Sequence, residues 1–428
     1  MTELSLPDSF WAASAPPAIE TGRLEGARRT DVAIVGAGYT GLSTAIELAG
    51  EASVTVLEAG EIGHGGSGRN NGLAIPTLSG PDPDAIVRAW GEEIGERFVA
   101  LLRDSASHVY DLIRTHKMEG AGEQTGWIQP VHSPGRMRVA ESRVEQWARR
   151  GADVELLDAD RTSELLGSPF WHGGWMANTG GTVQPLAYTR GLAKAAAGLG
   201  ATIHTQSPVT SIKREGSVWL LKTPEGELRA DKVVLATNAY TDEVAPDLRR
   251  SIVPVYSFQM STRPLSDNIR KSVIPGRQAV SDTRGDLHFF RWTDDGRLVT
   301  GAALFFKHNP TGRLPQHVGD RVLRAFPQVG EVSFDYIWHG FIGATLDKLP
   351  HLHVLGPGFF AWIGCNGRGV ALASAMGPVL AEMVRGANVK AMPIPVTEPK
   401  PIPAHGLATR LAPLEVLRRR FNDAREPT

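Results

Sequence analysis

The apolar residues of the N-terminal part of the chain follow two different periods. Residues 31–35 and 54–57 are short apolar runs of the kind that form buried strands. Between them, residues 42–49 place apolar side chains at helical spacing, and Gly50 follows as a residue that often ends a helix. This order of strand, helix and strand predicts an α/β unit near the start of the chain.

The same two periods continue to the end of the chain. Helical spacing predicts helices at 84–118, 186–199, 370–384 and 407–421. Short apolar or alternating runs predict strands at 202–205, 209–213, 218–222, 227–229, 232–236, 253–260, 287–292, 298–300 and 359–363. Residues 1–27, rich in Pro, Ala and Ser, are expected to form an extended arm, and residues 121–180 are mixed.

A glycine turn joins the first predicted strand to the first predicted helix. Gly36 allows the tight turn, Gly38 lets a pyrophosphate approach the backbone, and Gly41 lets the helix pack closely on the strand. Glu58 follows 22 residues after Gly36, where an acid accepts hydrogen bonds from ribose hydroxyls and disfavours a 2′-phosphate. We expect a dinucleotide site, and the alternative is a plain glycine turn in an α/β domain.

Composition and charge narrow the classes of ligand. The chain has 428 residues, 45 of them Lys or Arg and 46 Asp or Glu, so a global basic footprint for nucleic acid is absent. The one cysteine, Cys365, excludes an internal disulfide and a multi-cysteine metal site, and we expect no metal. Without a secretory signal or a run of about 18 apolar residues, we expect a cytoplasmic protein with no integral membrane association.

A second glycine-rich segment, residues 65–72, follows the acid instead of the next helix and strand. Two phosphates need cationic and N–H donors, and Arg69 and Asn70 supply both. The alternative is that these side chains only stabilise an irregular loop. With this segment included, residues 31–72 resemble the FAD-dependent amino acid and amine oxidase family, which includes D-amino acid oxidase, glycine oxidase and sarcosine oxidase. Residues 67–72 are most similar to the gamma-glutamylputrescine oxidase branch.

The resemblance implies a set of FAD contacts. They lie in the two glycine segments, after the second strand, near residues 209 and 237, and in a C-terminal glycine turn. The implied contacts are Gly36, Gly38, Tyr39, Thr40, Gly41, Glu58, Ala59, Gly66, Ser67, Arg69, Asn70, Asn71, Gly72, Val209, Thr237, Asn238, Gly364, Asn366, Gly367, Arg368, Gly369 and Val370. The C-terminal turn would place a helix N-terminus at the pyrimidine end of the flavin, where reduction puts negative charge.

Two positions depart from the sarcosine oxidases of this family. Their cysteine that links the flavin lies near the position of Phe341 here, whereas Cys365 lies in the C-terminal turn. We therefore expect non-covalent FAD. Their lysine for the substrate carboxylate corresponds to Ala371, which disfavours an N-methyl glycine substrate.

The family layout implies two interleaved domains. A Rossmann-like FAD-binding domain of α/β class would combine residues 28–85, 182–252 and 346–390. An α+β substrate domain containing an antiparallel sheet would combine 86–181 and 253–345. Residues 1–27 would be an N-terminal arm. Residues 391–428 would be a C-terminal tail that packs on its own domain or touches a partner or membrane surface.

The implied reaction is hydride transfer from the carbon next to a neutral amine to flavin N5, followed by imine hydrolysis. Such sites often need a dry ring face more than a strong base. Candidate pocket residues are Tyr256, His288, Trp338 and His339, each of which could instead be structural. Arg368 could add a positive charge or touch the substrate, and the alternative is that it points to solvent. The partners would be a small amine or amino acid and oxygen. The alternatives are a dehydrogenase that passes electrons to a quinone or carrier protein, and a flavin-binding redox sensor without turnover.

Overall fold

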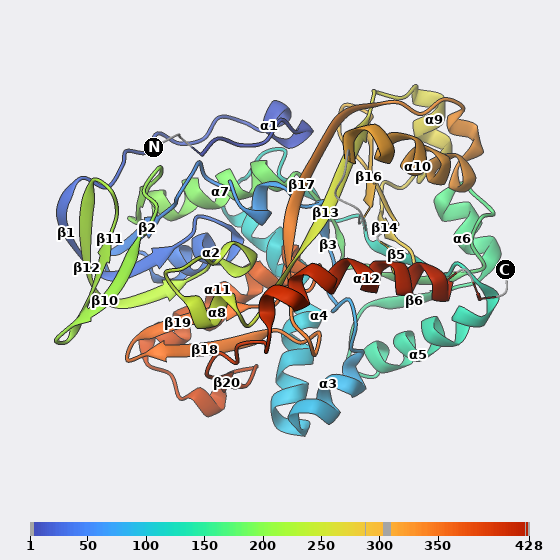
Figure 1. The fold of residues 1–428 in the computed structure, drawn as a ribbon. Helices are drawn as coiled ribbons and strands as arrows, with labels where there is room; N and C mark the ends of the chain where they lie inside the picture. Colours follow the sequence, from blue (N-terminus) through green and yellow to red (C-terminus); the bar gives the residue numbers. More distant parts are fainter. Residues whose placement is uncertain (1–3, 287, 303–309, 424, 427–428) are drawn as a thin grey trace.

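Two large β-sheets form the framework of the protein in a computed structural model. It describes residues 4–286, 288–302, 310–423, 425 and 426. One sheet has nine strands and the other eight, and helices pack around both (Figure 1). This combination confirms the expected mixed α/β architecture with an additional sheet that is mainly antiparallel.

The nine-stranded sheet has a parallel centre. Its main path runs through β20 (Val396–Thr397), β18 (His351–Gly356), β19 (Phe359–Ile363), β12 (Gly226–Leu235), β1 (Gly26–Val35), β2 (Val54–Leu57) and β9 (Thr202–His204). The antiparallel pair β10 (Ser211–Glu215) and β11 (Val218–Lys222) joins the sheet through β12. The central strands are apolar because the sheet is covered on both faces, with Ile34 in one core cluster and Ala33 in another.

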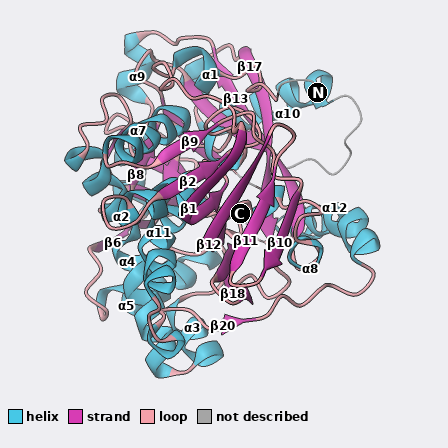
Figure 2. Cartoon of the chain, turned by 90° about the vertical axis from the view of Figure 1, so that its left-hand side faces the viewer, coloured by secondary structure: helices cyan, strands magenta, loops and turns pink. Residues whose placement is uncertain are grey.

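Helices α2 (Tyr39–Leu48), α7 (Pro185–Gly198), α11 (Gly369–Arg385) and α4 (Glu92–Thr115) lie together on one side of this sheet (Figure 2). The backbones of α2 and α11 approach closely. A methyl group added at Gly377 of α11 would overlap Cβ of Ser43 in α2. The two helices that start beside the cofactor motifs are therefore packed directly on each other.

The eight-stranded sheet is antiparallel except between β14 and β5. Its order is β17 (Phe334–Ala344), β13 (Val253–Thr262), β16 (Leu298–Ala302), β15 (Phe289–Trp292), β14 (Ala279–Ser281), β5 (Trp127–Pro130), β7 (Gly174–Ala177) and β6 (Val154–Leu157). Strands β3 (Leu73–Ala74), β8 (Gly181–Val183) and β4 (Gly122–Glu123) form a separate small sheet. The strands of the two large sheets alternate along the sequence, and the domain boundaries given above stay a prediction.

Several expected elements have different bounds. The long helix at 84–118 is two helices, α3 (Pro83–Trp90) and α4, because Gly91 between them has φ +81°. The strands expected at 227–229 and 232–236 are one strand, β12, which pairs with β1 almost residue by residue. The arm is not wholly extended, since it contains the short helix α1 (Phe10–Ser14). Residue 287 of one expected strand lies outside the described residues.

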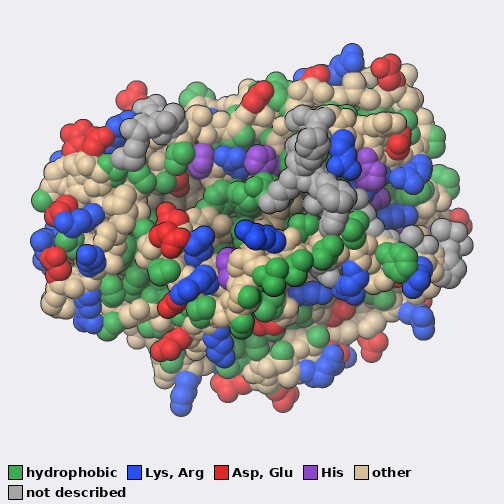
Figure 3. Space-filling view, viewed as in Figure 1, with side chains coloured by type: hydrophobic (Ala, Val, Ile, Leu, Met, Phe, Trp, Pro, Cys, Tyr) green, Lys and Arg blue, Asp and Glu red, His purple; other side chains and the backbone are tan. Residues whose placement is uncertain are grey.

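The C-terminal tail packs on the body of the protein and forms α12 (His405–Asp423), beside β13. His405 Nε2 lies 2.8 Å from Ile252 O, and Gly285 N–H donates to Asp423 Oδ2 at 2.9 Å. Its large apolar side chains face outward, between 40% and 57% exposed, and form a ridge that Figure 3 shows along this helix: Leu407, Leu411, Leu414, Leu417 and Phe421. Among the described residues, no helix is long and apolar enough to cross a membrane.

The contact between α2 and α11 gives a prediction about stability. Gly377→Ala should lower the free energy of unfolding by about 1–3 kcal/mol, because the new methyl group overlaps Ser43 and the helices must separate. Gly198→Ala is the matched control, since Gly198 also lies in a helix and has open space around it. Thermal unfolding followed by circular dichroism should show a lower midpoint for Gly377→Ala alone. Equal midpoints would contradict close packing of the two helices.

Candidate functional site

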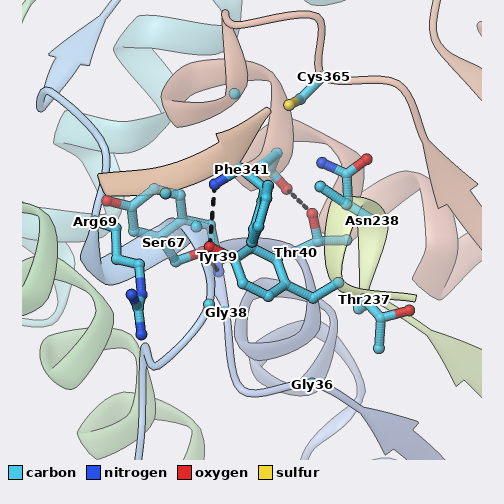
Figure 4. Close-up of a pocket in the computed structure, with 18 of the residues that line it drawn as sticks. Gly36, Gly38, Tyr39, Thr40, Ser67, Arg69, Thr237, Asn238, Phe341 and Cys365 are labelled. Atoms are coloured by element: carbon cyan, nitrogen blue, oxygen red, sulfur yellow. Dashed lines mark hydrogen bonds between the residues drawn. The ribbon is translucent and has the colours of Figure 1, made fainter. Parts of the chain in front are cut away.

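A cavity of about 380 Å³ lies between the two large sheets. Its walls come from the ends of β1, β2, β12 and β19, from residues 64–71, and from β13, β15 and β17. The parallel strands point their carboxyl ends at this cavity, which is where open α/β sheets bind ligands. Figure 4 shows the glycine turn, Ser67, Asn238 and Phe341 arranged around it.

The first glycine turn forms one end of the cavity. Gly36 has φ +108°, and its N–H donates to Leu57 O at 2.8 Å. A side chain at Gly41 would overlap Gly36 O, so the turn needs glycine there. Helix α2 starts at Tyr39, and its first residues line the cavity, so its N-terminus, with its partial positive charge, is directed at the cavity. The turn that the sequence predicts as a pyrophosphate site therefore lies at the cavity, where Gly36, Gly38, Tyr39 and Thr40 line it.

Glu58 lines the cavity from the end of β2, next to Ala59. Its carboxylate accepts from Ala37 N–H at 2.8 Å and from Gly60 N–H at 3.0 Å. Burial raises the pKa of Glu58, and these backbone donors oppose the rise. Each oxygen has a further lone pair, so the carboxylate could also accept ribose hydroxyls.

Residues 61–72 dock on the N-terminus of α2. Tyr39 N–H donates to Ser67 Oγ at 3.0 Å, and Asn70 Nδ2 donates to Tyr39 Oη at 3.0 Å. The same amide also donates to Gly66 O at 3.1 Å, and its Oδ1 accepts from Gly72 N–H at 2.8 Å. The amide of Asn70 therefore holds the loop, which favours the loop-stabilising alternative for this side chain.

Arg69 also forms hydrogen bonds with the protein backbone. Its Nε donates to His64 O at 2.6 Å, and its Nη1 lies 3.4 Å from His339 O. Burial lowers the pKa of this guanidinium. Arg69 lines the cavity, as do Gly66, Ser67, Asn70 and Asn71, whereas Gly72 is not among the lining residues that the structure describes.

The ends of β12 and β19 form a further part of the cavity wall, and β12 lies beside the first glycine turn. Asn238 Oδ1 accepts from Gly364 N–H at 3.0 Å and so ties the two strand ends together. Asn366 has φ +48°, and its Oδ1 accepts from Thr345 N–H at 2.9 Å, which shapes the C-terminal turn. Of the expected contacts in these segments, the described cavity wall includes Val209, Thr237, Asn238, Gly367, Gly369 and Val370, together with Cys365, and does not include Gly364, Asn366 or Arg368.

Arg368 precedes the first residue of α11 and points toward the eight-stranded sheet. Its guanidinium lies 4.8 Å from the centre of the Trp127 ring. Burial lowers its pKa, with a further contribution from Arg143. Its buried Nη1 has no hydrogen-bond partner within the described structure. Arg368 therefore does not point to solvent, which was the alternative reading of this residue.

Strands β13 and β17 form the remaining wall, and the sequence did not identify these residues. Ser257 pairs with Gly340 across the two strands, and both line the cavity with Gln259 and with Phe289 of β15. Phe341 also lines it, and its N–H donates to Tyr240 Oη at 3.2 Å. The pattern at 253–260 predicted a strand, whose side chains alternate between the two faces of a sheet. It did not indicate which of the two faces lines the cavity.

The other candidate pocket residues have structural partners. His288 pairs with Asp286 at 3.0 Å, and Trp338 donates its indole N–H to Arg69 O at 2.9 Å. The ring of Tyr256 packs against Phe341 at 4.5 Å and lies 5.5 Å from His339. The cavity wall in the described part of the chain contains none of these four expected residues, His288, Trp338, Tyr256 and His339.

Two buried polar atoms test whether the cavity fits FAD. Trp362 Nε1 and His64 Nδ1 both belong to residues that line it, and within the described structure neither atom has a hydrogen-bond partner. Buried polar atoms are normally satisfied, so these atoms are suited to a polar ligand. Glu58 lines the cavity, and so does the N-terminus of α2. The residues of the cavity therefore fit a dinucleotide cofactor.

Comparison with known proteins agrees with this geometry. Residues 31–383 match the family model described as DAO, FAD dependent oxidoreductase. The chain is 30% identical over 382 residues to gamma-glutamylputrescine oxidoreductase of Escherichia coli strain K12, covering 88% of this chain and 89% of the relative. It is 24% identical to glycine oxidase of Pseudomonas aeruginosa, over 86% and 97% of the two chains.

The fold is also similar to a solved structure. Glycine oxidase from Geobacillus kaustophilus superposes with a TM-score of 0.73 and 22% identity, over 86% of this chain and 99% of that one. The resemblance inferred from residues 31–72 is confirmed. The chain belongs to the DAO family of FAD-dependent oxidoreductases.

Proposed function

We propose that this enzyme oxidises the carbon–nitrogen bond of a small primary or secondary amine or amino acid, and that oxygen is the final electron acceptor. FAD, held without a covalent bond, would supply the acceptor for the hydride from the carbon next to the nitrogen. The imine product would then hydrolyse to an aldehyde or ketone and an amine or ammonia. The printed names of two relatives, a gamma-glutamylputrescine oxidoreductase and a glycine oxidase, support an amine or amino acid substrate.

The observation that carries this proposal is the continuity of the cavity. It runs from the glycine turn and Glu58, in the nine-stranded sheet, to Gln259 and Phe289 in the eight-stranded sheet. A dinucleotide bound at the turn would thus extend toward the inner face of the second sheet. A substrate between the cofactor and that face would be shielded from water, which favours transfer of a hydride.

The residues proposed to hold FAD follow the cavity in order. Glu58 and Val209 would contact the ribose and adenine, and the turn from Gly36 to Thr40 would receive the pyrophosphate. The N-terminus of α11, at Gly369 and Val370, would lie at the other end of the cofactor. There its N–H groups and dipole stabilise negative charge.

The proposed substrate space is nearly neutral. Among the described residues, the lining side chains from the eight-stranded sheet are Ser257, Gln259, Phe289, Phe341 and Ile342, none of which carries a charge. Burial raises the pKa of the nearby Tyr240, so its hydroxyl stays protonated at neutral pH. These residues can orient an unprotonated amine and exclude water, and catalysis would rest on positioning more than on a protein base.

Arg368 lies outside the described cavity wall, and we propose that it binds the substrate from the adjoining face of the eight-stranded sheet. Trp127, on which it stacks, pairs with Ala279, and Phe289 pairs with Ser281 two residues further along β14. Trp127 and Phe289 therefore face the same side of the sheet. The guanidinium lies on the face that lines the cavity, and its unpartnered Nη1 could donate to a polar group of the substrate.

Anaerobic titration with amines tests the reaction. The purified protein should show flavin absorption bands, and a pool of amines and amino acids should bleach them, because electrons from the substrate reduce the flavin. A pool of the corresponding alcohols and carboxylic acids is the control and should leave the bands unchanged. Bands that persist with every amine would contradict the proposed substrate class. Oxygen consumption against reduction of an artificial dye would then distinguish an oxidase from a dehydrogenase.

Acid precipitation tests the mode of FAD binding. The yellow colour should stay in the supernatant, because Cys365 lies in the C-terminal turn, whereas the linking cysteine of the sarcosine oxidases lies near the position of Phe341. Absorption spectra of supernatant and redissolved pellet measure the outcome. Cys365→Ser is the control and should release the same fraction of flavin. Colour that stays in the pellet for the native protein but not for Cys365→Ser would show a thioether instead.

Replacement of Arg368 tests its proposed contact. With the amine found by titration, Arg368→Met should raise KM about 10- to 100-fold, because a charge-assisted hydrogen bond is lost. Arg368→Lys should recover part of the loss, and flavin content should stay unchanged in both variants. Steady-state kinetics with FAD quantified by absorption provide the measurement. A lower melting temperature with unchanged KM would show that Arg368 is structural.

A further inference from the structure

The N-terminal arm crosses the outside of the cofactor site, and it contacts that site at two places. Its helix α1 lies against residues 69–72, and Leu4 lines the cavity itself. Leu6 N–H donates to Glu61 Oε1 at 3.2 Å, which holds the arm between these two places. The arm therefore contacts residues near both ends of the loop at 61–72.

Two tryptophans hold consecutive carbonyl groups of that loop. Trp11 donates its indole N–H to Asn70 O at 2.8 Å, and Trp338 of β17 donates to Arg69 O at 2.9 Å. The two rings pack edge to face with centres 5.5 Å apart. Because the donors come from the arm and from the eight-stranded sheet, the loop is fixed from outside by parts of the chain remote in sequence.

Trp11 is itself held firmly. It is fully buried, its carbonyl accepts from Gln184 Nε2 at 3.0 Å, and the guanidinium of Arg291 lies 5.2 Å from its ring centre. Arg291 in turn donates to Gly72 O at 3.3 Å, at the end of the same loop. The arm, the loop and the buried Arg291 therefore form one connected set of contacts.

We infer that residues 4–14 form a clasp that retains FAD, with Trp11 as its positioning residue. Docking of the clasp fixes the carbonyl of Asn70 and with it the loop whose Ser67 meets the N-terminus of α2. Since the docked loop is the form that binds FAD, arm docking and FAD binding stabilise each other. The inference rests on FAD binding and does not depend on which substrate is oxidised.

Replacing the indole N–H tests the clasp. Trp11→Phe in the full-length holoenzyme should bind FAD about fivefold more weakly and release it faster, because one hydrogen bond to the loop is lost. Trp219→Phe is the matched control. Trp219 is buried and also donates its indole N–H to a backbone carbonyl, Pro357 O at 3.0 Å, but it does not line the cavity. Flavin fluorescence on release from the protein measures both rates.

A second measurement reports on the arm directly. Chymotrypsin should cut after Phe10 or Trp11 faster in the apoprotein than in the holoenzyme, since both side chains are buried when the arm is docked. Added FAD should slow this cut in the native chain, and less so in Trp11→Phe. Equal release rates for Trp11→Phe and Trp219→Phe, or a cut at the arm that FAD leaves unchanged, would overturn the clasp. Neither measurement uses an amine, so its failure is separate from failure of the proposed reaction.

Discussion

The close approach of residues 63–68 to the first turn of α2 is the constraint on which the cofactor site depends. A side chain at Gly38 would lie 2.7 Å from Ser67 Oγ, so only glycine allows Ser67 to accept from Tyr39 N–H. Gly63 N–H donates to Ala37 O at 3.2 Å on the other side of the turn. These contacts fix the loop relative to the helix N-terminus, and the remaining walls of the cavity are built around that pair. The site therefore depends on backbone geometry before any side chain meets a ligand.

Buried charge reinforces this arrangement. Glu58 and Arg291 are both buried, and each charge is compensated mainly by backbone groups. Burial lowers the pKa of Arg291 to about 10, and its guanidinium donates to the carbonyls of Gly72 and Trp292. A buried charge that lost these partners would be costly, so each one disfavours alternative paths for the surrounding backbone. Glu58 restricts the backbone at the end of β2. Arg291 restricts it at Gly72, the last residue of the loop.

Local patterns were sufficient to predict the residues that form one end of the cavity. The strand at 31–35, the glycine turn and Glu58 lie within 28 residues, so their relation can be read along the chain. The face of β13 and β17 could not be predicted, because the pairing of Ser257 with Gly340 joins residues far apart in sequence. The local pattern predicted separate strands at 227–229 and 232–236, yet pairing with β1 carries β12 through residues 230 and 231. Here the long-range partner, and not the local pattern, decides the bounds of the strand.

The loop also shows why a motif can identify a cofactor while misassigning the role of its side chains. The amide group of Asn70 looked like a phosphate donor, but it donates to Tyr39 Oη and Gly66 O and accepts from Gly72 N–H. Asn71 Oδ1 likewise accepts from Leu73 N–H at 3.2 Å. Residues of this kind specify a backbone path, and the indole of Trp11 adds to the same task from outside the motif. The polar side chains of the segment 65–72 are thus needed for the shape of the loop. The groups that remain available to a ligand are largely those of the backbone.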